Sequence, residues 1–131
     1  MSWNDDTAAR TIWQEARNQG VIGMKAVAHV IRNRVADGRW GKVAAEACLW
    51  PLQFSGWRPS DPNYGASCRL SEDDPILQTC LNAWVASESE PDPTEGACFY
   101  HTVNMNPPPS WARAMHETVV IGAHIFYRDR A

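Results

Sequence analysis

Glu15, the only carboxylate in the stretch RTIWQEARNQG (residues 10–20), is the first candidate for chemistry in this sequence. On a helical wheel, at about 100° per residue, it falls about 60° from Ile12, at the border of an apolar stripe. We therefore expect Glu15 to be partly buried. Apolar surroundings raise the pKa of a carboxylic acid, which can then deliver a proton near neutral pH. Glu15 is thus either a solvated surface charge or a catalytic acid.

Other reactive side chains lack the spacing that their chemistry requires. The four histidines show no H-E-x-x-H or other metal-ligand spacing, and the cysteines contain no C-x-x-C pair. We therefore predict no metal ion and no cofactor. Ser55, in QFSGW, lacks the flanking glycines of a nucleophile elbow, and no glycine motif for phosphate binding occurs.

The cysteines leave two states open. They are Cys48, Cys68, Cys80 and Cys98. Free buried thiols are expected if the protein works in the cytosol, whereas one or two disulfides would form if it works outside it.

Aromatic residues gather in segments whose composition is typical of loops and strand ends. The chain has seven tryptophans in 131 residues, and these segments hold Trp50, Phe54, Trp57, Tyr64, Tyr100 and Trp111. Aromatic side chains on loops line grooves for ligands with flat, partly apolar faces, and sugar rings have such faces. Any one of them could instead fill the core of a small domain. The whole set favours a groove that binds saccharides.

Helices precede short strands along the chain. Apolar periodicity and capping residues predict helices over residues 5–18, 21–36, 43–49 and 74–87. Residues 50–67 are rich in Pro, Gly and Ser, which indicates an ordered loop. Strand character marks ACFYHTV (97–103) and ETVVIGAHIFYRD (117–129), and WARAM (111–115) is predicted to form a helical turn. The predicted fold class is α+β, predominantly helical with a few short strands.

Length and charge limit the remaining possibilities. A chain of 131 residues is expected to form a single domain over residues 1–131. The net charge of −3 is spread along the chain, which argues against nucleic-acid partners and against a polybasic membrane patch. No apolar run can span a bilayer, and MSWNDDTAAR lacks the features of a signal peptide. We expect a monomer, made in the cytoplasm, that does not insert into membranes.

Four blocks of the sequence resemble those of the cell-wall hydrolase family typified by the spore-cortex-lytic enzyme SleB. The blocks are IWQEARNQGVIGMKAVAHVIRNRV, PLQFSGW, ACFYHTVNMNPPPSWA and IGAHIFY, in the same order and at similar intervals. The resemblance covers roughly residues 10–128. It implies a lysozyme-like domain related to goose lysozyme and lytic transglycosylases, with the glycan strands of bacterial peptidoglycan as substrate. The family's catalytic glutamate falls on Glu15.

The resemblance also implies roles for residues downstream. The substrate-binding residues that it implies are Gln53, Phe54, Ser55, Trp57, His101 and Trp111. Tyr100 is implied as a second catalytic residue, which orients the substrate or stabilises charge near the anomeric carbon. Asn33 and Arg34 match the family block too, but because they lie on a buried helix we assign them to structural hydrogen bonds.

One position departs from the family pattern. Many relatives read E-A-R-G-E, whereas EARNQ places Gln19 where the second carboxylate would stand. An amide forms hydrogen bonds but cannot act as a base. Either a carboxylate at this position is not essential to the chemistry or this protein is impaired, and we favour the first reading.

Three activities remain open at this point. Simple hydrolysis by a lysozyme-type muramidase requires a second carboxylate, for which Glu46, Glu95 and Glu117 are the candidates. A lytic transglycosylase needs Glu15 alone, since the C6 hydroxyl of the muramic acid attacks C1 and forms a 1,6-anhydro end. A glycan-binding module without catalysis is the third reading. We favour the transglycosylase, cleaving between MurNAc and GlcNAc, because the blocks place no second carboxylate convincingly.

Two further expectations follow. An amidase or peptidase is disfavoured, because the sequence has neither a metal site nor a Cys/His pair in a recognised motif. Because no signal peptide is visible, we expect the protein to reach the cell wall as a phage endolysin does, after release through a separate pore.

Overall fold

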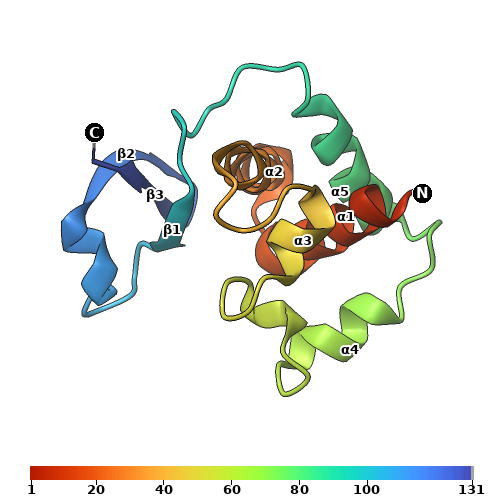
Figure 1. The fold of residues 1–131 in the computed structure, drawn as a ribbon. Helices are drawn as coiled ribbons and strands as arrows, with labels where there is room; N and C mark the ends of the chain where they lie inside the picture. The colour runs from red at the N-terminus through yellow and green to blue at the C-terminus, as the bar shows by residue number, and fades with distance from the viewer. Residues whose placement is uncertain (131) are drawn as a thin grey trace.

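The computed structural model describes residues 1–130, and most of its regular structure is helical (Figure 1). Its helices are α1 (Trp3–Ala16), α2 (Gly20–Asp37), α3 (Ala44–Leu49), α4 (Pro62–Cys68) and α5 (Pro75–Ala86). Short 3-10 turns span Ser55–Trp57 and Ser110–Ala114. The four helices predicted from periodicity are present, each within two residues of its predicted bounds. The fold is α+β and predominantly helical, as predicted.

Local sequence explains where the helices begin and end. The Ser2 side chain accepts a hydrogen bond from the Asp5 backbone N–H and caps α1. Asp74 caps α5 in the same way, with Pro75 at the first helical position. Helix α2 ends at Gly38, whose φ of +90° suits glycine because it has no Cβ.

The prediction that residues 50–67 form a loop is wrong for its second half. Helix α4 begins there, capped by the Asp61 carboxylate, which accepts from the Asn63 backbone N–H, with Pro62 at the first helical position. The same Asp-Pro start opens α5. Helix α4 escaped notice because the Pro, Gly and Ser content of residues 50–67 indicated a loop and its seven residues hold no apolar stripe.

The sheet has three antiparallel strands in the order β1-β3-β2. They are β1 (Phe99–Thr102), β2 (Met115–Ile121) and β3 (His124–Asp129). The predicted strand segment around Gly122 is therefore a hairpin, which turns at Gly122 with a φ of +58°. In β1, Tyr100 pairs with Phe126 of β3, and His101 pairs with Ile125.

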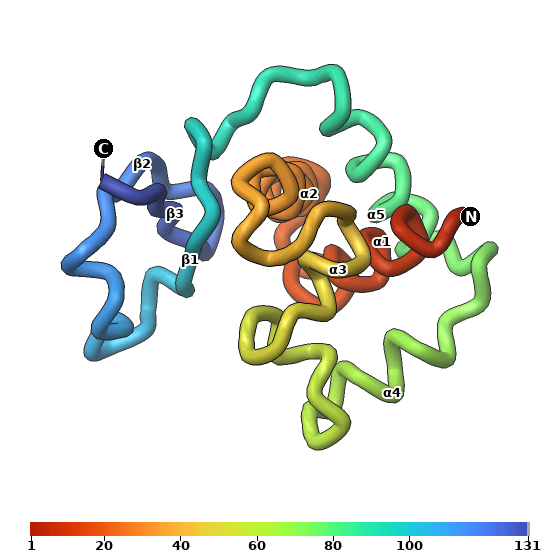
Figure 2. Tube along the Cα trace, in the orientation of Figure 1, coloured from red at the N-terminus to blue at the C-terminus, as the bar shows by residue number. Residues whose placement is uncertain are grey.

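Helix α2 connects the helices to the sheet. Figures 1 and 2 show the sheet on one side of α2 and helices α1, α3 and α5 on the other. Val27 and Ile31 of α2 belong to the fully buried cluster that unites the helices. Val30, on a different face, packs in a second cluster with Phe126 of β3. The position of α2 therefore fixes where β1 stands relative to α1.

The cysteines are free thiols. Cys48, Cys80 and Cys98 are buried and Cys68 is exposed, and none of the four forms a disulfide in the described chain. Burial raises the pKa of Cys48 and of Cys80 to about 12, so both are neutral thiols. In residues 1–130 no helix combines the length and the hydropathy that crossing a membrane would require.

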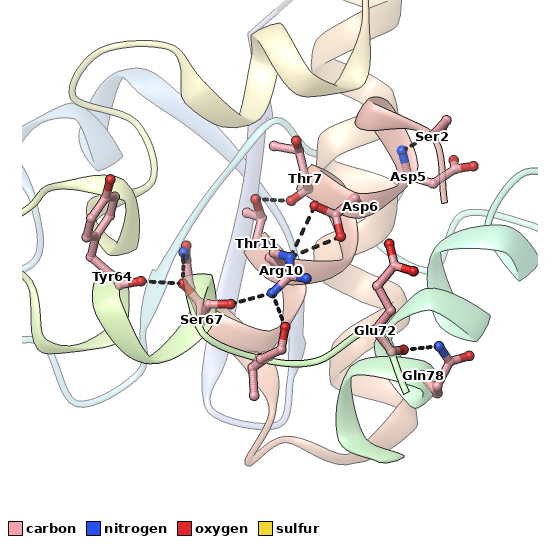
Figure 3. Close-up of polar contacts among 12 residues, drawn as sticks. Ser2, Asp5, Asp6, Thr7, Arg10, Thr11, Tyr64, Ser67, Glu72 and Gln78 are labelled. Carbon is pink, nitrogen blue, oxygen red and sulfur yellow. Dashed lines mark hydrogen bonds and ion pairs between the residues drawn. The ribbon is translucent and has the colours of Figure 1, made fainter. Parts of the chain in front are cut away.

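Arg10 fastens the segment that contains α4 to helix α1 (Figure 3). Its Nη1 donates to the carbonyl oxygens of Ser67, at 2.6 Å, and Leu70, at 3.0 Å. Its Nε donates to the Asp6 carboxylate at 3.0 Å. Gln14 adds a bond of 2.9 Å from Nε2 to the Ser67 hydroxyl. These bonds hold residues 61–70 alongside the helix that carries Glu15.

We expect Arg10→Met to lower the free energy of unfolding by about 3 kcal/mol, because it leaves two carbonyls and one carboxylate without their donor. Urea denaturation measures the change. Arg58→Met is the matched control, since Arg58 is exposed, and should change stability by less than about 0.5 kcal/mol. Equal losses in both variants would contradict the anchoring role of Arg10.

Candidate active site

Glu15 lies in the last turn of α1 and is half-buried, as its position on the helical wheel predicted. The hydroxyl of Tyr100, on β1, donates a hydrogen bond to Glu15 Oε1. This contact joins residues 85 positions apart. Because Oε1 accepts from Tyr100, Oε2 is the oxygen left to carry the proton of the neutral acid.

The surroundings of Glu15 favour its protonated form. Burial is the largest influence and raises its pKa above the ordinary value of 4.5. The Tyr100 hydrogen bond and the positive charge of Arg34 act in the opposite direction, and the Asp61 carboxylate raises the pKa further. Burial and the neighbouring Glu15 also raise the pKa of Tyr100 well above 10, so the phenol stays neutral and remains a donor.

A cleft of about 340 Å³ opens in front of this pair. It is lined by Arg34, Leu52, Gln53, Phe99, Tyr100 and Trp111. Tyr100 belongs both to the cleft wall and to the hydrogen bond with Glu15, so it links the cleft to the acid, which is not itself among the lining residues. The rings of Phe99 and Trp111 lie 5.7 Å apart and form an aromatic side of the cleft. The dimensions and lining suit a saccharide.

Three predicted residues, Gln53, Tyr100 and Trp111, meet in this cleft, whereas Glu15 and four others do not line it. Phe54 is buried beneath Arg34, with the guanidinium carbon 4.9 Å from its ring centre. Ser55 is exposed at the start of a 3-10 turn.

Trp57 and His101 also lie elsewhere. Trp57 donates from Nε1 to the Thr11 hydroxyl at 2.8 Å and lines a different hollow. His101 is buried, its Nδ1 donates to the Thr102 carbonyl, and its Nε2 accepts from the Tyr127 hydroxyl, both at 2.8 Å. His101 packs against the cleft residue Trp111, and these two hydrogen bonds keep its ring out of the lining, although Tyr100 beside it lines the cleft.

Arg34 is the cleft residue that sequence reasoning left out. It forms the structural hydrogen bonds expected of it, from Nε to the Cys98 carbonyl at 2.8 Å and from Nη1 to Gln53 Oε1 at 3.1 Å. It also lines the cleft, which the sequence analysis did not expect of it. No signal in the sequence distinguished it from the other cations of α2, Lys25 and Arg32. Asn33, by contrast, bonds only to Asp92 and the Ala97 carbonyl.

Comparison with known proteins assigns the chain to a family. Residues 18–127 match the family model described as Cell Wall Hydrolase. The chain belongs to this cell wall hydrolase family. The matched range begins three residues after Glu15, so the role of that residue depends on the geometry described above. A comparison with curated protein sequences finds no match.

Two solved structures share the fold of this cell wall hydrolase. The catalytic domain of the germination-specific lytic transglycosylase SleB from Bacillus anthracis has a TM-score of 0.78 and 22% identity, covering 98% of this chain and 96% of that chain. The catalytic domain of the Bacillus cereus SleB protein has a TM-score of 0.77 and 24% identity, covering 97% and 91%. The SleB-type, lysozyme-like α+β fold is thereby confirmed.

Gln19 has a structural function in this cell wall hydrolase. Its Oε1 accepts a hydrogen bond of 3.1 Å from the backbone N–H of Ala123, in the turn between β2 and β3. A carboxylate oxygen could accept the same bond. The amide therefore keeps the sheet attached to the junction of α1 and α2 without taking part in proton transfer.

The acid that bears on Glu15 is one that sequence reasoning missed. Asp61 raises the pKa of Glu15, whereas Glu46, Glu95 and Glu117 are not among its main influences. Glu46 accepts from the backbone N–H of Lys42 at an exposed position. In residues 1–130, the structure therefore does not identify Glu46, Glu95 or Glu117 as a partner of Glu15.

The raised pKa of Glu15 has a consequence for stability. Between the pKa of the unfolded chain and the higher pKa of the folded chain, the folded state binds more protons, so the free energy of unfolding falls as pH rises. Glu15→Gln removes this titration and keeps an oxygen that accepts from Tyr100. We therefore expect the Tm of Glu15→Gln, relative to wild type, to increase between pH 4 and pH 8 in thermal melts.

The control for this comparison is Glu88→Gln, at an exposed position after α5, which should track wild type across the same range. A change of about 1 kcal/mol corresponds to about 4 °C in a domain of this size, so the difference is measurable. A relative Tm that falls with pH would contradict a raised pKa.

Proposed function

We propose that this protein cleaves peptidoglycan glycan strands between MurNAc and GlcNAc as a lytic transglycosylase, with Glu15 as both acid and base. The observation that carries the proposal is a half-buried carboxylic acid bonded to Tyr100, a residue that lines a saccharide-sized cleft. Membership of the cell wall hydrolase family supports it. So does the fold shared with a domain described as a lytic transglycosylase.

The first step is proton delivery. Glu15 Oε2 gives its proton to the glycosidic oxygen, the bond from that oxygen to C1 of the muramoyl sugar breaks, and positive charge develops at C1. Burial favours the acid before this step, because it disfavours the carboxylate. The carboxylate that remains is stabilised by the Tyr100 hydroxyl and the positive charge of Arg34, both of which lower the pKa of Glu15.

The second step regenerates the acid. The Glu15 carboxylate takes the proton of the C6 hydroxyl of the same sugar, and that oxygen forms a bond to C1. The product is a 1,6-anhydro end, Glu15 is protonated again, and no water is consumed. One carboxyl group therefore performs both proton transfers, which is consistent with Gln19 at the position of the second family carboxylate.

The cleft supplies the contacts that orient the strand. Phe99 and Trp111 offer aromatic faces for sugar rings, and Gln53 offers an amide whose oxygen already accepts from Arg34. The free N–H groups of that amide can donate to acceptor oxygens of the N-acetyl groups. Tyr100 lines this surface and bonds to Glu15 Oε1, so a sugar bound there would bring its glycosidic oxygen to Glu15 Oε2 beside Tyr100.

A muramidase is the second candidate, and Asp61 is the observation that favours it. Its negative charge raises the pKa of Glu15, as the smallest of the four influences on that pKa. In a hydrolase it would activate water or attack C1, and the product would carry a reducing muramic acid end.

Mass spectrometry of the soluble products tests the proposal. Purified peptidoglycan is incubated with the wild-type protein, with Glu15→Gln and with the exposed control Glu88→Gln. We expect anhydro-muropeptides from wild type and control, and a loss of at least about 100-fold in Glu15→Gln because the general acid is missing. Reducing ends would establish the muramidase instead. Retention on cell walls without glycan products would leave a binding module.

A further inference from the structure

Arg34 is a buried cation without a carboxylate partner. It is 5% exposed and forms no ion pair with a carboxylate in residues 1–130. Its bonded partners are the Cys98 carbonyl and the Gln53 amide, and the rings of Trp40 and Phe54 lie 4.7 Å and 4.9 Å from its guanidinium carbon. These groups are neutral, and Glu15, whose charge would act on Arg34, is favoured in its protonated form by burial, which raises its pKa. Buried charges are normally paired, because desolvation is costly.

The guanidinium still has donors to offer. Nε and Nη1 each make one hydrogen bond, whereas Nη2 donates to no other residue that the structure describes. In residues 1–130, two side-chain polar atoms are inaccessible to solvent and have no hydrogen-bond partner, Gln14 Oε1 and His29 Nε2. Arg34 Nη2 is not one of them, so this atom is accessible to solvent. Since Arg34 lines the cleft, its free N–H groups are reached from there.

The rim beside Arg34 is strained. Leu52 has a φ of +66°, which is unfavourable for a residue with a Cβ, and it is 81% exposed while lining the same cleft. The bond from Arg34 to Gln53 holds the next residue of this turn in place. Strained backbone beside a cleft is characteristic of ligand-binding sites. Two independent features, an unpaired cation and a strained rim, thus coincide at one point.

Another hollow contains an arginine without these properties. The hollow of about 300 Å³ between α1, α2 and α5 includes Arg32. The Arg32 guanidinium already donates to the Ser87 hydroxyl and the Trp84 carbonyl and stacks on the Trp84 ring. The cleft at Arg34 is therefore the better anion site.

We propose that Arg34 binds a carboxylate of the peptidoglycan strand and that this contact fixes the strand in the cleft. The proposal rests on the substrate class of the proposed function. A guanidinium donates parallel hydrogen bonds to a carboxylate and supplies its counter-charge, so the bound anion completes the pairing that the protein lacks. Peptidoglycan offers such a group at the lactyl side chain of a muramoyl sugar without a stem peptide, or on the stem peptide itself.

Titration calorimetry on the full chain with Glu15→Gln, which prevents turnover, tests this proposal. The first probe is the tetrasaccharide of two GlcNAc–MurNAc units with free lactyl carboxylates, and the second is its neutral lactyl methylamide. The third carries intact stem peptides. We expect one of the two carboxylate-bearing probes to bind at least about tenfold more tightly than the methylamide.

Variants of Arg34 in the Glu15→Gln protein test whether Arg34 causes the preference for a carboxylate. Arg34→Gln should remove the preference for the carboxylate, and Arg34→Lys should retain part of it, because the lysine keeps the charge but not the paired donors. A preference for the free lactyl probe identifies the lactyl carboxylate, and a preference confined to the third probe identifies the stem peptide. If Arg34→Gln does not fold, the comparison of the three probes still tests whether the cleft prefers a carboxylate.

Equal binding of all three probes would overturn the proposal, as would an unchanged preference in Arg34→Gln. These outcomes are separate from those of the product analysis, because binding is measured without cleavage. A protein that releases anhydro ends but binds all probes equally keeps the proposed function and loses this inference.

Discussion

The hydrogen bond between Tyr100 and Glu15 joins the two parts of the fold at the proposed reaction centre. Its donor comes from the sheet and its acceptor from the first helix. The bond exists because α2 packs against both, with Val27 among the helices and Val30 against the sheet. The buried side chains of α2 thereby act on chemistry that they do not touch. Any change that moves α2 would separate the acid from its partner.

Burial of Glu15 imposes a cost that the surrounding residues limit. An acid removed from water keeps its proton, which suits proton delivery, but its carboxylate is then poorly stabilised. Tyr100 and Arg34 offset part of that penalty. Arg34 is itself buried and lacks an anionic partner, so the site holds an acid and a cation that are both short of solvation. Such imbalance is common where a binding site is complete only with its ligand present.

The sequence predicted features that depend on neighbouring residues, such as helices, much better than contacts between segments that are distant in the chain. Periodicity and caps predicted the long helices, but α4, with its start at Asp61 and Pro62, was too short for a periodic signal. The resemblance implied that Tyr100 and His101 share the groove, whereas hydrogen bonds to Thr102 and Tyr127 keep His101 buried outside the cleft lining. Arg34 was set aside because it lies on a buried helix, and the partners that bring it to the cleft, such as Cys98, 64 positions away, leave no local pattern in the sequence.

The central claim is that burial raises the pKa of Glu15 above that of a solvated carboxyl and so favours its protonated form. Carboxyl 13C NMR measures this directly, by following the side-chain carbon of Glu15 against pH and assigning it by its absence in Glu15→Gln. The structure predicts one carboxyl signal that titrates with a midpoint above 4.5. A midpoint at or below 4.5 would mean that Glu15 is an ordinary solvated carboxylate, and the account of the active site would fail.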